Sequence, residues 1–430
     1  MLKEKQKYTL KCEEMNNFGN AVCRIDGMVV FVNGAVSGDI VEAEIQKITS
    51  SYALAAVTRI VTPSPHRIAP DCAVFGECGG CSFLNVNIQK ENEIKEGYVR
   101  STMRKFGIEA EVVPIVCPTH ITYRNKIILF YENGKLGYMA PATNRVIPHN
   151  RCPLNDKLLD DIARFSLEEL DTTYLRALYI RKTSNESPEL MVCPIFKKQT
   201  DIKHYARRLK SEFEGVVSVM SGVCAGRDFV LEACEFKHIL GEEFIEDSLC
   251  GLDFEISPKS FYQINHKCAE QLYEKTVNLL GATEKSKVAD LFCGTGTIGL
   301  IVAKRTGAYV YGVELEAEAV KDAKRNAALN DVQNIEFYEG DAKNFNKKVD
   351  MCIIDPPRRG CSDFMIETLL RLSPKKIVYV SCNPDTLARD LKKLTKKYDI
   401  SSPVTPYNMF PRTSHIESVV CLTRQANEKG

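Results

Sequence analysis

Several features that would assign a chain to a common class are missing here. The net charge is only +1, so no overall charge excess points to a partner. No stretch approaches the roughly 20 consecutive apolar residues of a membrane-spanning helix. The first residues, MLKEKQKYTLKCEE, are charged and contain no apolar run, so we expect no signal peptide. No internal repeat or low-complexity segment is present. We therefore expect a cytoplasmic protein, acting as a monomer and not bound to a membrane.

Cysteine, in contrast, is abundant, with 17 residues in a chain of 430. In a short exported chain this content would indicate disulfide bonds. In a long chain without an export signal it indicates reduced thiols, metal ligands or catalytic residues. With 430 residues, of which 44% are hydrophobic, the chain can bury more than one core, and we expect two or three domains.

The first 256 residues have the pattern of β-structure. Within residues 1–62, the segment DIVEAEIQKI alternates apolar and polar residues, which predicts a strand with one buried face. Glycines near the strand ends favour tight turns, so we predict an OB-like antiparallel β-barrel of a class that often binds single-stranded RNA. The alternative is a barrel used only for packing. Residues 63–256 are expected to form a β-rich central domain, interrupted by a cysteine cluster and a helix from about 87 to 106.

Residues 257–430 change to alternating strands and helices. Five short apolar segments, KVADLF, YVYGVE, IEFYEG, DMCIID and KIVYVS, are separated by enough chain for a helix or a loop. This pattern predicts an α/β fold with a Rossmann-like open sheet. Ligands of such sheets bind at the carboxyl ends of the strands.

A candidate cofactor site begins at VADLFCGTGTIGL, residues 288–300. Gly294 and Gly296 let the backbone approach a ligand closely, and with Gly299 they form a G-x-G-x-x-G turn. Glu314 ends the next strand, where a carboxylate can accept hydrogen bonds from two ribose hydroxyls. These features indicate an adenosine-containing ligand, but a dinucleotide would fit them as well.

The later strand ends favour S-adenosylmethionine. Asp341 follows the third strand and is expected beside the adenine. Asp355 is followed by two prolines, which make a stiff turn over a substrate pocket. This combination suits a cofactor that carries adenine and ribose but no phosphate. The alternative is that these acids only cap the following helices.

A catalytic pair is predicted at the same edge of the sheet. One class of enzymes that use S-adenosylmethionine methylates nucleic-acid bases. In the methylation of uracil, carbon 5 becomes nucleophilic only after a group adds to carbon 6, and a thiolate suits that step. Cys382 lies just past the fifth strand and is the candidate nucleophile, with Cys361 a weaker one. The last strand of such sheets commonly runs antiparallel, which would bring Glu417 beside Cys382 as the base that removes the carbon 5 proton. His415 is the rival base.

These segments carry a resemblance to a known family. SFYQIN (260–265), DLFCGTG, GVE, DPPRRG, SCNP and MFPRTSHIE are similar to motifs of the RNA 5-methyluridine (uracil-C5) methyltransferases, over essentially the whole chain. The resemblance implies that Cys382 is the nucleophile and Glu417 the base. It also implies that the helix near 87–110 packs on the catalytic domain, and that the barrel is a TRAM domain. The residues implied to contact the cofactor are Gln263, Phe292, Glu314 and Asp355.

A cysteine cluster has metal-ligand spacing. Cys72, Cys78 and Cys81 form a C-x5-C-x2-C pattern, and Cys152, which precedes a proline, is the candidate fourth ligand. The residues alone do not separate zinc from iron. Relatives with this spacing carry a four-iron four-sulfur (4Fe-4S) cluster, so the resemblance implies that cofactor.

Three alternatives compete with the favoured substrate and activity. The barrel and the cysteine cluster resemble the ribosomal-RNA branch, which implies 23S rRNA as the substrate; transfer RNA is the alternative. A catalytically silent iron–sulfur protein that binds RNA would leave the predicted catalytic pair unexplained. A radical S-adenosylmethionine enzyme would require a C-x3-C-x2-C motif, which the sequence lacks.

Overall fold

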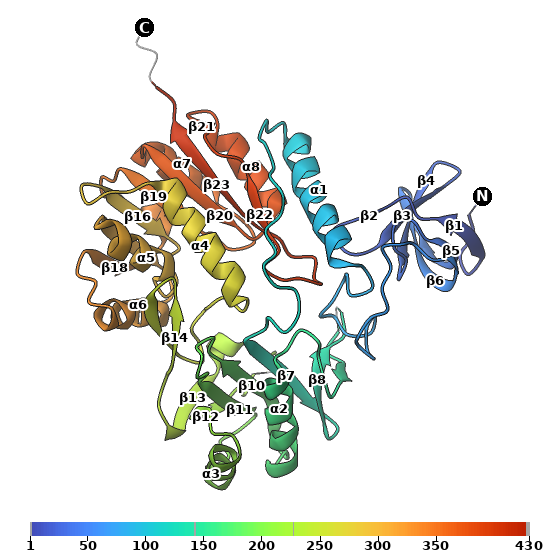
Figure 1. Ribbon diagram of the computed structural model, residues 1–430, viewed down its shortest axis with the longest axis horizontal. Helices are drawn as coiled ribbons and strands as arrows, with labels where there is room; N and C mark the ends of the chain where they lie inside the picture. The colour runs from blue at the N-terminus through green and yellow to red at the C-terminus, as the bar shows by residue number, and fades with distance from the viewer. Residues whose placement is uncertain (1, 142, 227, 427–430) are drawn as a thin grey trace.

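The computed structural model describes residues 2–141, 143–226 and 228–426. Three lobes are visible in Figure 1, with the N-terminal sheet at the right, a second sheet at the bottom, and the C-terminal α/β sheet at the upper left. No helix in these residues combines the length and the apolar composition needed to cross a membrane.

The N-terminal lobe is a six-stranded sheet in the order β1-β5-β6-β4-β3-β2. The alternation in β5 has the predicted effect, because Val41, Ala43 and Ile45 are fully buried. One strand pair differs from the expected antiparallel barrel, since β4 and β6 run parallel. The strands are β1 (Lys7–Lys11), β2 (Glu14–Met15), β3 (Ala21–Ile25), β4 (Met28–Asn33), β5 (Ile40–Ile48) and β6 (Tyr52–Thr62).

The central lobe contains a seven-stranded mixed sheet in the order β13-β12-β11-β10-β7-β8-β9, and a separate hairpin, β14-β15. Helices α2 and α3 pack on this sheet through a shared apolar cluster. The elements are β7 (Lys126–Glu132), β8 (Lys135–Met139), β9 (Val146–Pro148), α2 (Lys157–Glu169), β10 (Leu175–Lys182), β11 (Leu190–Phe196), α3 (Lys203–Glu212), β12 (Val216–Val223), β13 (Glu235–Gly241), β14 (Ile245–Leu249) and β15 (Leu252–Ile256), with a 3-10 turn, η1 (Leu231–Ala233).

The C-terminal lobe confirms the predicted α/β fold. Its main strand order is β18-β17-β16-β19-β20-β23-β21; β16 to β20 are parallel, β23 is antiparallel, and β22 pairs with β23. The elements are α4 (His266–Leu280), β16 (Lys287–Leu291), α5 (Thr297–Thr306), β17 (Tyr309–Glu314), α6 (Ala317–Leu329), β18 (Ile335–Glu339), η2 (Ala342–Asn344), β19 (Met351–Ile354), α7 (Asp363–Leu372), β20 (Lys376–Ser381), α8 (Pro384–Leu394), β21 (Tyr398–Ile400), β22 (Thr405–Tyr407) and β23 (Glu417–Arg424).

Helix α1 (Ile88–Phe106) precedes the central lobe in the sequence but lies against α8 (Figure 1). Its ends follow local signals: the Asn87 side chain accepts a hydrogen bond from the Lys90 N–H, and Gly107 ends the helix with a φ of 73°. The Tyr98 hydroxyl donates a hydrogen bond to Asp385 in the first turn of α8. The helix thereby ties the segment after the N-terminal sheet to the C-terminal lobe.

Candidate active site

The turn after β16 is shaped to leave room for a ligand. Phe292, Gly294 and Gly296 all have positive φ angles, of 71°, 54° and 81°. Glycine is needed at position 296, because a Cβ there would lie 2.7 Å from the Phe337 ring. Gly296 also caps α5, so the free N–H groups of that helix face the turn.

Glu314 joins this turn to the end of β17. One carboxylate oxygen accepts a hydrogen bond from the Gly294 N–H at 3.0 Å, and the other accepts from the N–H groups of Leu315 and Glu316 at 2.7 and 3.0 Å. The oxygen that accepts only from the Gly294 N–H retains a further lone pair for a ligand. The carboxylate is therefore held in a fixed position at the carboxyl edge of the sheet.

Asp290 stabilises the same turn through a hydrogen bond to its backbone. Its side chain is buried and accepts a hydrogen bond from the Gly299 N–H at 2.9 Å. Burial raises the pKa of this carboxyl to about 7. Asp290 was not predicted as a site residue; the available signal was its position near the end of the first parallel strand, β16.

The other predicted cofactor residues lie around this edge at different depths. Gln263 is buried in the segment between β15 and α4, and the Asn125 amide donates to its carbonyl at 3.2 Å. Asp341 caps η2 and forms an ion pair with Lys343 at 2.8 Å, with 39% of its side chain exposed. Asp355 follows β19 directly, and burial raises its pKa to about 7.

The strand register brings the predicted catalytic residues together. Ser381, the last residue of β20, is paired with Ser418 of β23, so Cys382 and Glu417 lie directly beyond the last pair of this antiparallel ladder. Burial, followed by the carboxylates of Glu417 and Asp355, raises the pKa of the Cys382 thiol to about 12. Burial, and then the charge of Asp355, raises the pKa of Glu417 to about 8. A thiol and a carboxyl group therefore meet beside the cofactor turn.

His415, the rival base, already has a partner. The Arg358 guanidinium group lies 3.0 Å from Nε2 of His415 and 3.3 Å from Nδ1. Burial, followed by the charge of Arg358, lowers the pKa of His415 to about 4. A group with so low a pKa is a weak proton acceptor.

A buried ionic network supports the segment that leads into β23. Glu91 and Lys95 of α1 are both fully buried and form an ion pair at 2.9 Å. Glu91 also pairs with Arg412 at 3.2 Å and accepts from the Arg412 N–H at 2.8 Å. Lys95 donates to the Asn408 side chain at 2.6 Å. No local pattern in the sequence predicts this network, because its two halves lie more than 300 positions apart.

The same segment contacts the cysteine-rich loop. The Arg412 carbonyl accepts hydrogen bonds from the N–H groups of Ser82 and Phe83, at 2.6 and 3.0 Å. These residues follow Cys81 directly. The loop that carries three predicted metal ligands is thus joined to the segment that ends at Glu417.

The four predicted metal ligands border one small cavity. Cys72, Cys78, Cys81 and Cys152 all line it. Among the described residues, no three His, Cys, Asp or Glu side chains converge closely enough to hold a metal ion. Arg124 also lines the cavity, and its Nε is buried without a hydrogen-bond partner in the part of the chain described. Four sulfur donors and a buried cation fit an anionic, thiolate-held group.

The comparisons with known proteins agree with this architecture. Residues 2–58 match the TRAM domain family, and residues 282–415 match a methyltransferase domain family. An RNA methyltransferase of Listeria monocytogenes is 32% identical, covering 98% of each chain, and one of Clostridium tetani is 31% identical, covering 100% of this chain and 98% of its own.

A solved structure extends the likeness to three dimensions. The tRNA (uracil-54, C5)-methyltransferase of Pyrococcus abyssi, in complex with S-adenosyl-L-homocysteine, has a TM-score of 0.79 and 28% identity. The match covers 97% of this chain and 100% of that one. The shared domains and the relatives that match along almost their entire length show that this chain belongs to the RNA methyltransferase family.

Proposed function

We propose that this protein transfers a methyl group from S-adenosylmethionine to carbon 5 of a uracil in RNA. The observation that carries the proposal is the register of β20 and β23, whose last pair, Ser381 with Ser418, places Cys382 and Glu417 directly beyond it. A cysteine and a carboxyl group side by side at the cofactor edge match the two chemical needs of uracil methylation, a nucleophile and a base. The uracil-C5 methyltransferase of Pyrococcus abyssi, whose fold matches, supports the same chemistry.

The steps of the reaction follow from these groups. The Cys382 thiol gives up its proton to solvent, and the resulting thiolate bonds to carbon 6. The electron pair of the carbon 5–carbon 6 double bond then makes carbon 5 nucleophilic. Carbon 5 then bonds to the methyl group, and S-adenosylhomocysteine leaves. Glu417 takes the carbon 5 proton, the carbon–sulfur bond breaks, and the thiolate is expelled. Glu417 takes this proton in place of His415, because burial and the charge of Arg358 keep the pKa of His415 near 4.

The substrate proposed is 23S rRNA, with transfer RNA as the alternative suggested by the tRNA enzyme of similar fold. Mapping 5-methyluridine by mass spectrometry in ribosomal and transfer RNA from cells that lack this protein separates the two. Loss of the modification from 23S rRNA alone is expected. Unchanged 5-methyluridine in both RNA classes would contradict the proposed function.

We expect the methylation rate to rise with pH. Burial and Asp355 raise the pKa of Glu417 to about 8, so the carboxyl group is largely protonated at pH 7 and becomes a base only above that value. Because kcat/KM reports groups of the free enzyme, it should rise steeply up to about pH 8. Above that value it should rise less steeply, because the Cys382 thiol, whose pKa is raised to about 12, must also lose its proton. Initial rates of methyl transfer from about pH 6 to about pH 9.5 test this. A rate that is independent of pH across this range would contradict the role of Glu417.

Cofactor affinity is expected to depend on Glu314. Removing the carboxylate leaves two ribose hydroxyls without their acceptor, which costs about 1–3 kcal/mol. Glu314→Ala should therefore weaken S-adenosylmethionine binding roughly 5- to 100-fold, measured by calorimetry. Glu318→Ala is a matched control, because Glu318 lies on the exposed side of α6 and pairs only with Lys321 among the contacts described. An unchanged dissociation constant for Glu314→Ala would refute its role.

We also propose that Cys72, Cys78, Cys81 and Cys152 hold a 4Fe-4S cluster, with zinc as the alternative. Such a group supplies a structural crosslink, and methyl transfer requires no electron from it. Cys78→Ala or Cys152→Ala is expected to remove the brown colour and lower solubility. Metal analysis of protein purified without oxygen tests this, with Cys117→Ala as control. Full iron content in both variants would exclude these ligands, whereas one zinc per chain would favour the alternative.

A further inference from the structure

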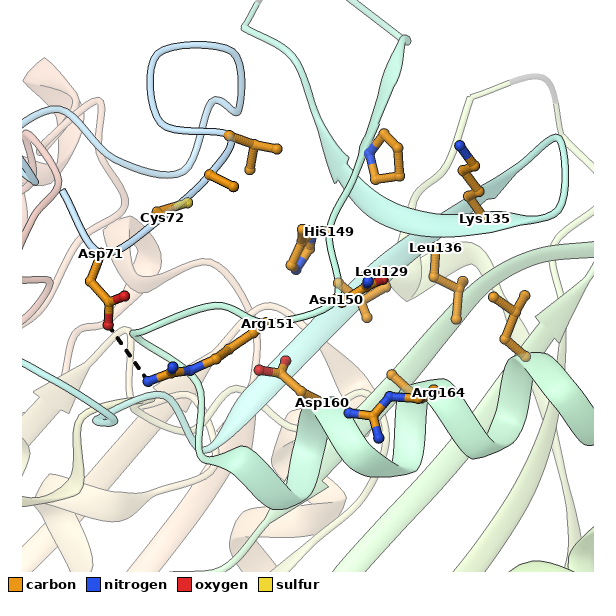
Figure 2. A pocket seen from close by; sticks show the side chains of 15 residues that line it. Asp71, Cys72, Leu129, Lys135, Leu136, His149, Asn150, Arg151, Asp160 and Arg164 are labelled. Carbon is orange, nitrogen blue, oxygen red and sulfur yellow. Dashed lines mark ion pairs between the residues drawn. The ribbon is translucent and has the colours of Figure 1, made fainter.

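A large pocket lies beside the cysteine cavity and outside the catalytic edge. Its volume is about 620 Å³, and it is formed by the loop around Cys72, the β7–β9 strands, the segment after β9, and α2 (Figure 2). This volume lies within the range of pockets that enclose a small organic ligand. Its lining combines apolar and charged residues, and neither the cofactor site nor the catalytic pair uses it.

One wall of the pocket offers an aromatic surface. His149 is stacked on Tyr138, with ring centroids 4.8 Å apart and an interplanar angle of 14°. Both ring nitrogens of His149 are buried and have no hydrogen-bond partner among the described residues. Leu129 and Leu136 continue this wall as apolar side chains (Figure 2). A planar, weakly polar surface of this kind suits the face of a nucleobase.

The rim of the pocket carries three cations. Figure 2 shows Lys135 on the opposite side of the pocket from Arg151 and Arg164. Arg151 pairs with Asp71 at 3.6 Å, but both side chains are more than 70% exposed, so water screens this ion pair and a phosphate can replace the carboxylate. Arg164 pairs with Asp161 at 3.0 Å and is also largely exposed.

Asp160, the other acid in the lining, forms hydrogen bonds within the protein. It accepts hydrogen bonds from the Cys152 N–H at 3.0 Å and from the Asn155 amide at 2.7 Å. These contacts stabilise its charge within the wall and connect the pocket to a predicted cluster ligand. Cys72 and His149 border both this pocket and the cysteine cavity, so the two sites share a wall.

We propose that this pocket binds one nucleotide of single-stranded RNA away from the methylated base. The base packs against His149 and the apolar wall, and the flanking phosphates contact Lys135, Arg151 and Arg164. The proposal rests on RNA being the substrate. It does not depend on which base is methylated, because its test measures RNA binding and not methyl transfer.

The test reverses two rim charges and measures RNA affinity. Lys135→Glu with Arg164→Glu should weaken binding of a single-stranded rRNA fragment about tenfold or more at moderate salt. Two lost phosphate contacts should also lower the slope of log K against log salt by about 1.4, because each contact on a single strand contributes about 0.7. Affinity for S-adenosylmethionine and metal content should not change, which would show that the fold is intact.

The matched control is Lys285→Glu with Lys396→Glu, which changes the net charge equally. Both lysines are exposed and precede β16 and β21, at the edge of the sheet opposite the carboxyl ends of β16 to β20. This control should alter RNA affinity less than twofold. An equal loss of affinity in both double variants would contradict RNA binding in this pocket and would indicate a general effect of charge. Unchanged affinity in the rim variant would also overturn it.

A second variant tests the base. His149→Ala removes the stacking surface and should weaken binding of the same RNA about fivefold or more, with no change in the salt slope, because no phosphate contact is lost. When an abasic nucleotide replaces the one bound in this pocket, His149→Ala and the unaltered protein should bind the RNA equally well. Equal binding of RNA by both proteins would exclude a base in this pocket.

Discussion

Cys382→Ala is expected to abolish methyl transfer, with a loss of roughly 10⁴-fold or more, because no other group can activate carbon 5 once the nucleophile is removed. RNA containing 5-fluorouridine gives the sharper measurement. Fluorine cannot leave as a cation, so the methylated adduct cannot be resolved. The unaltered protein with S-adenosylmethionine should form a protein–RNA band that survives denaturation, and Cys382→Ala should form none.

Cys361→Ala is the matched control for this result. Cys361 also follows a strand of the parallel sheet, but it is buried, and its N–H donates a hydrogen bond to Asp390 at 2.8 Å. Its sulfur accepts a hydrogen bond from Tyr379, below the edge where ligands bind. We therefore expect normal crosslinking from this variant. Crosslinking that persists in Cys382→Ala and disappears in Cys361→Ala would reverse the assignment of the nucleophile.

The α/β sheet could be predicted because its signals are local. Each of the five parallel strands is a short apolar run, and the turn after β16 needs glycine where a Cβ would strike Phe337. The antiparallel direction of the last strand was also expected from the sheet class, and its register places Glu417 and Cys382 directly beyond the last pair of the ladder. The parallel pairing of β4 with β6 was missed, because alternation of side chains is the same in parallel and antiparallel strands.

The contacts between residues that are far apart in the sequence could not be predicted, because only the fold brings those residues together. The sequence pattern indicates that Lys95 lies on an exposed face of its helix, but the side chain is fully buried. Burial lowers the pKa of Lys95, although the carboxylate of Glu91 acts in the opposite direction. Only the fold brings Arg412 to the same place. The pocket beside His149 was missed similarly, since its walls come from the cysteine-rich loop, β7 to β9 and α2. A periodic pattern within one segment cannot predict a cavity that forms between several segments of the chain.

Glu417→Gln is expected to separate the two halves of the reaction. Glutamine has nearly the same size, so Cys382 should still add to carbon 6 and the methyl group should still move to carbon 5. The amide cannot accept the carbon 5 proton as a carboxylate does, so the thiol cannot be expelled. The variant should accumulate a covalent protein–RNA adduct on ordinary uridine, while turnover falls roughly 10²- to 10⁴-fold.

The composition of this adduct decides between the remaining alternatives. If Glu417 is the base, mass spectrometry should find RNA that is attached to Cys382 and already methylated. An adduct without the methyl group would mean that Glu417 acts earlier, before methyl transfer. His415→Ala serves as the control: Arg358 and burial keep the pKa of His415 near 4, so this variant should turn over without accumulating adduct. If Glu417→Gln turns over normally and His415→Ala traps the adduct, the histidine is the base, and Glu417 takes no part in the proton transfer.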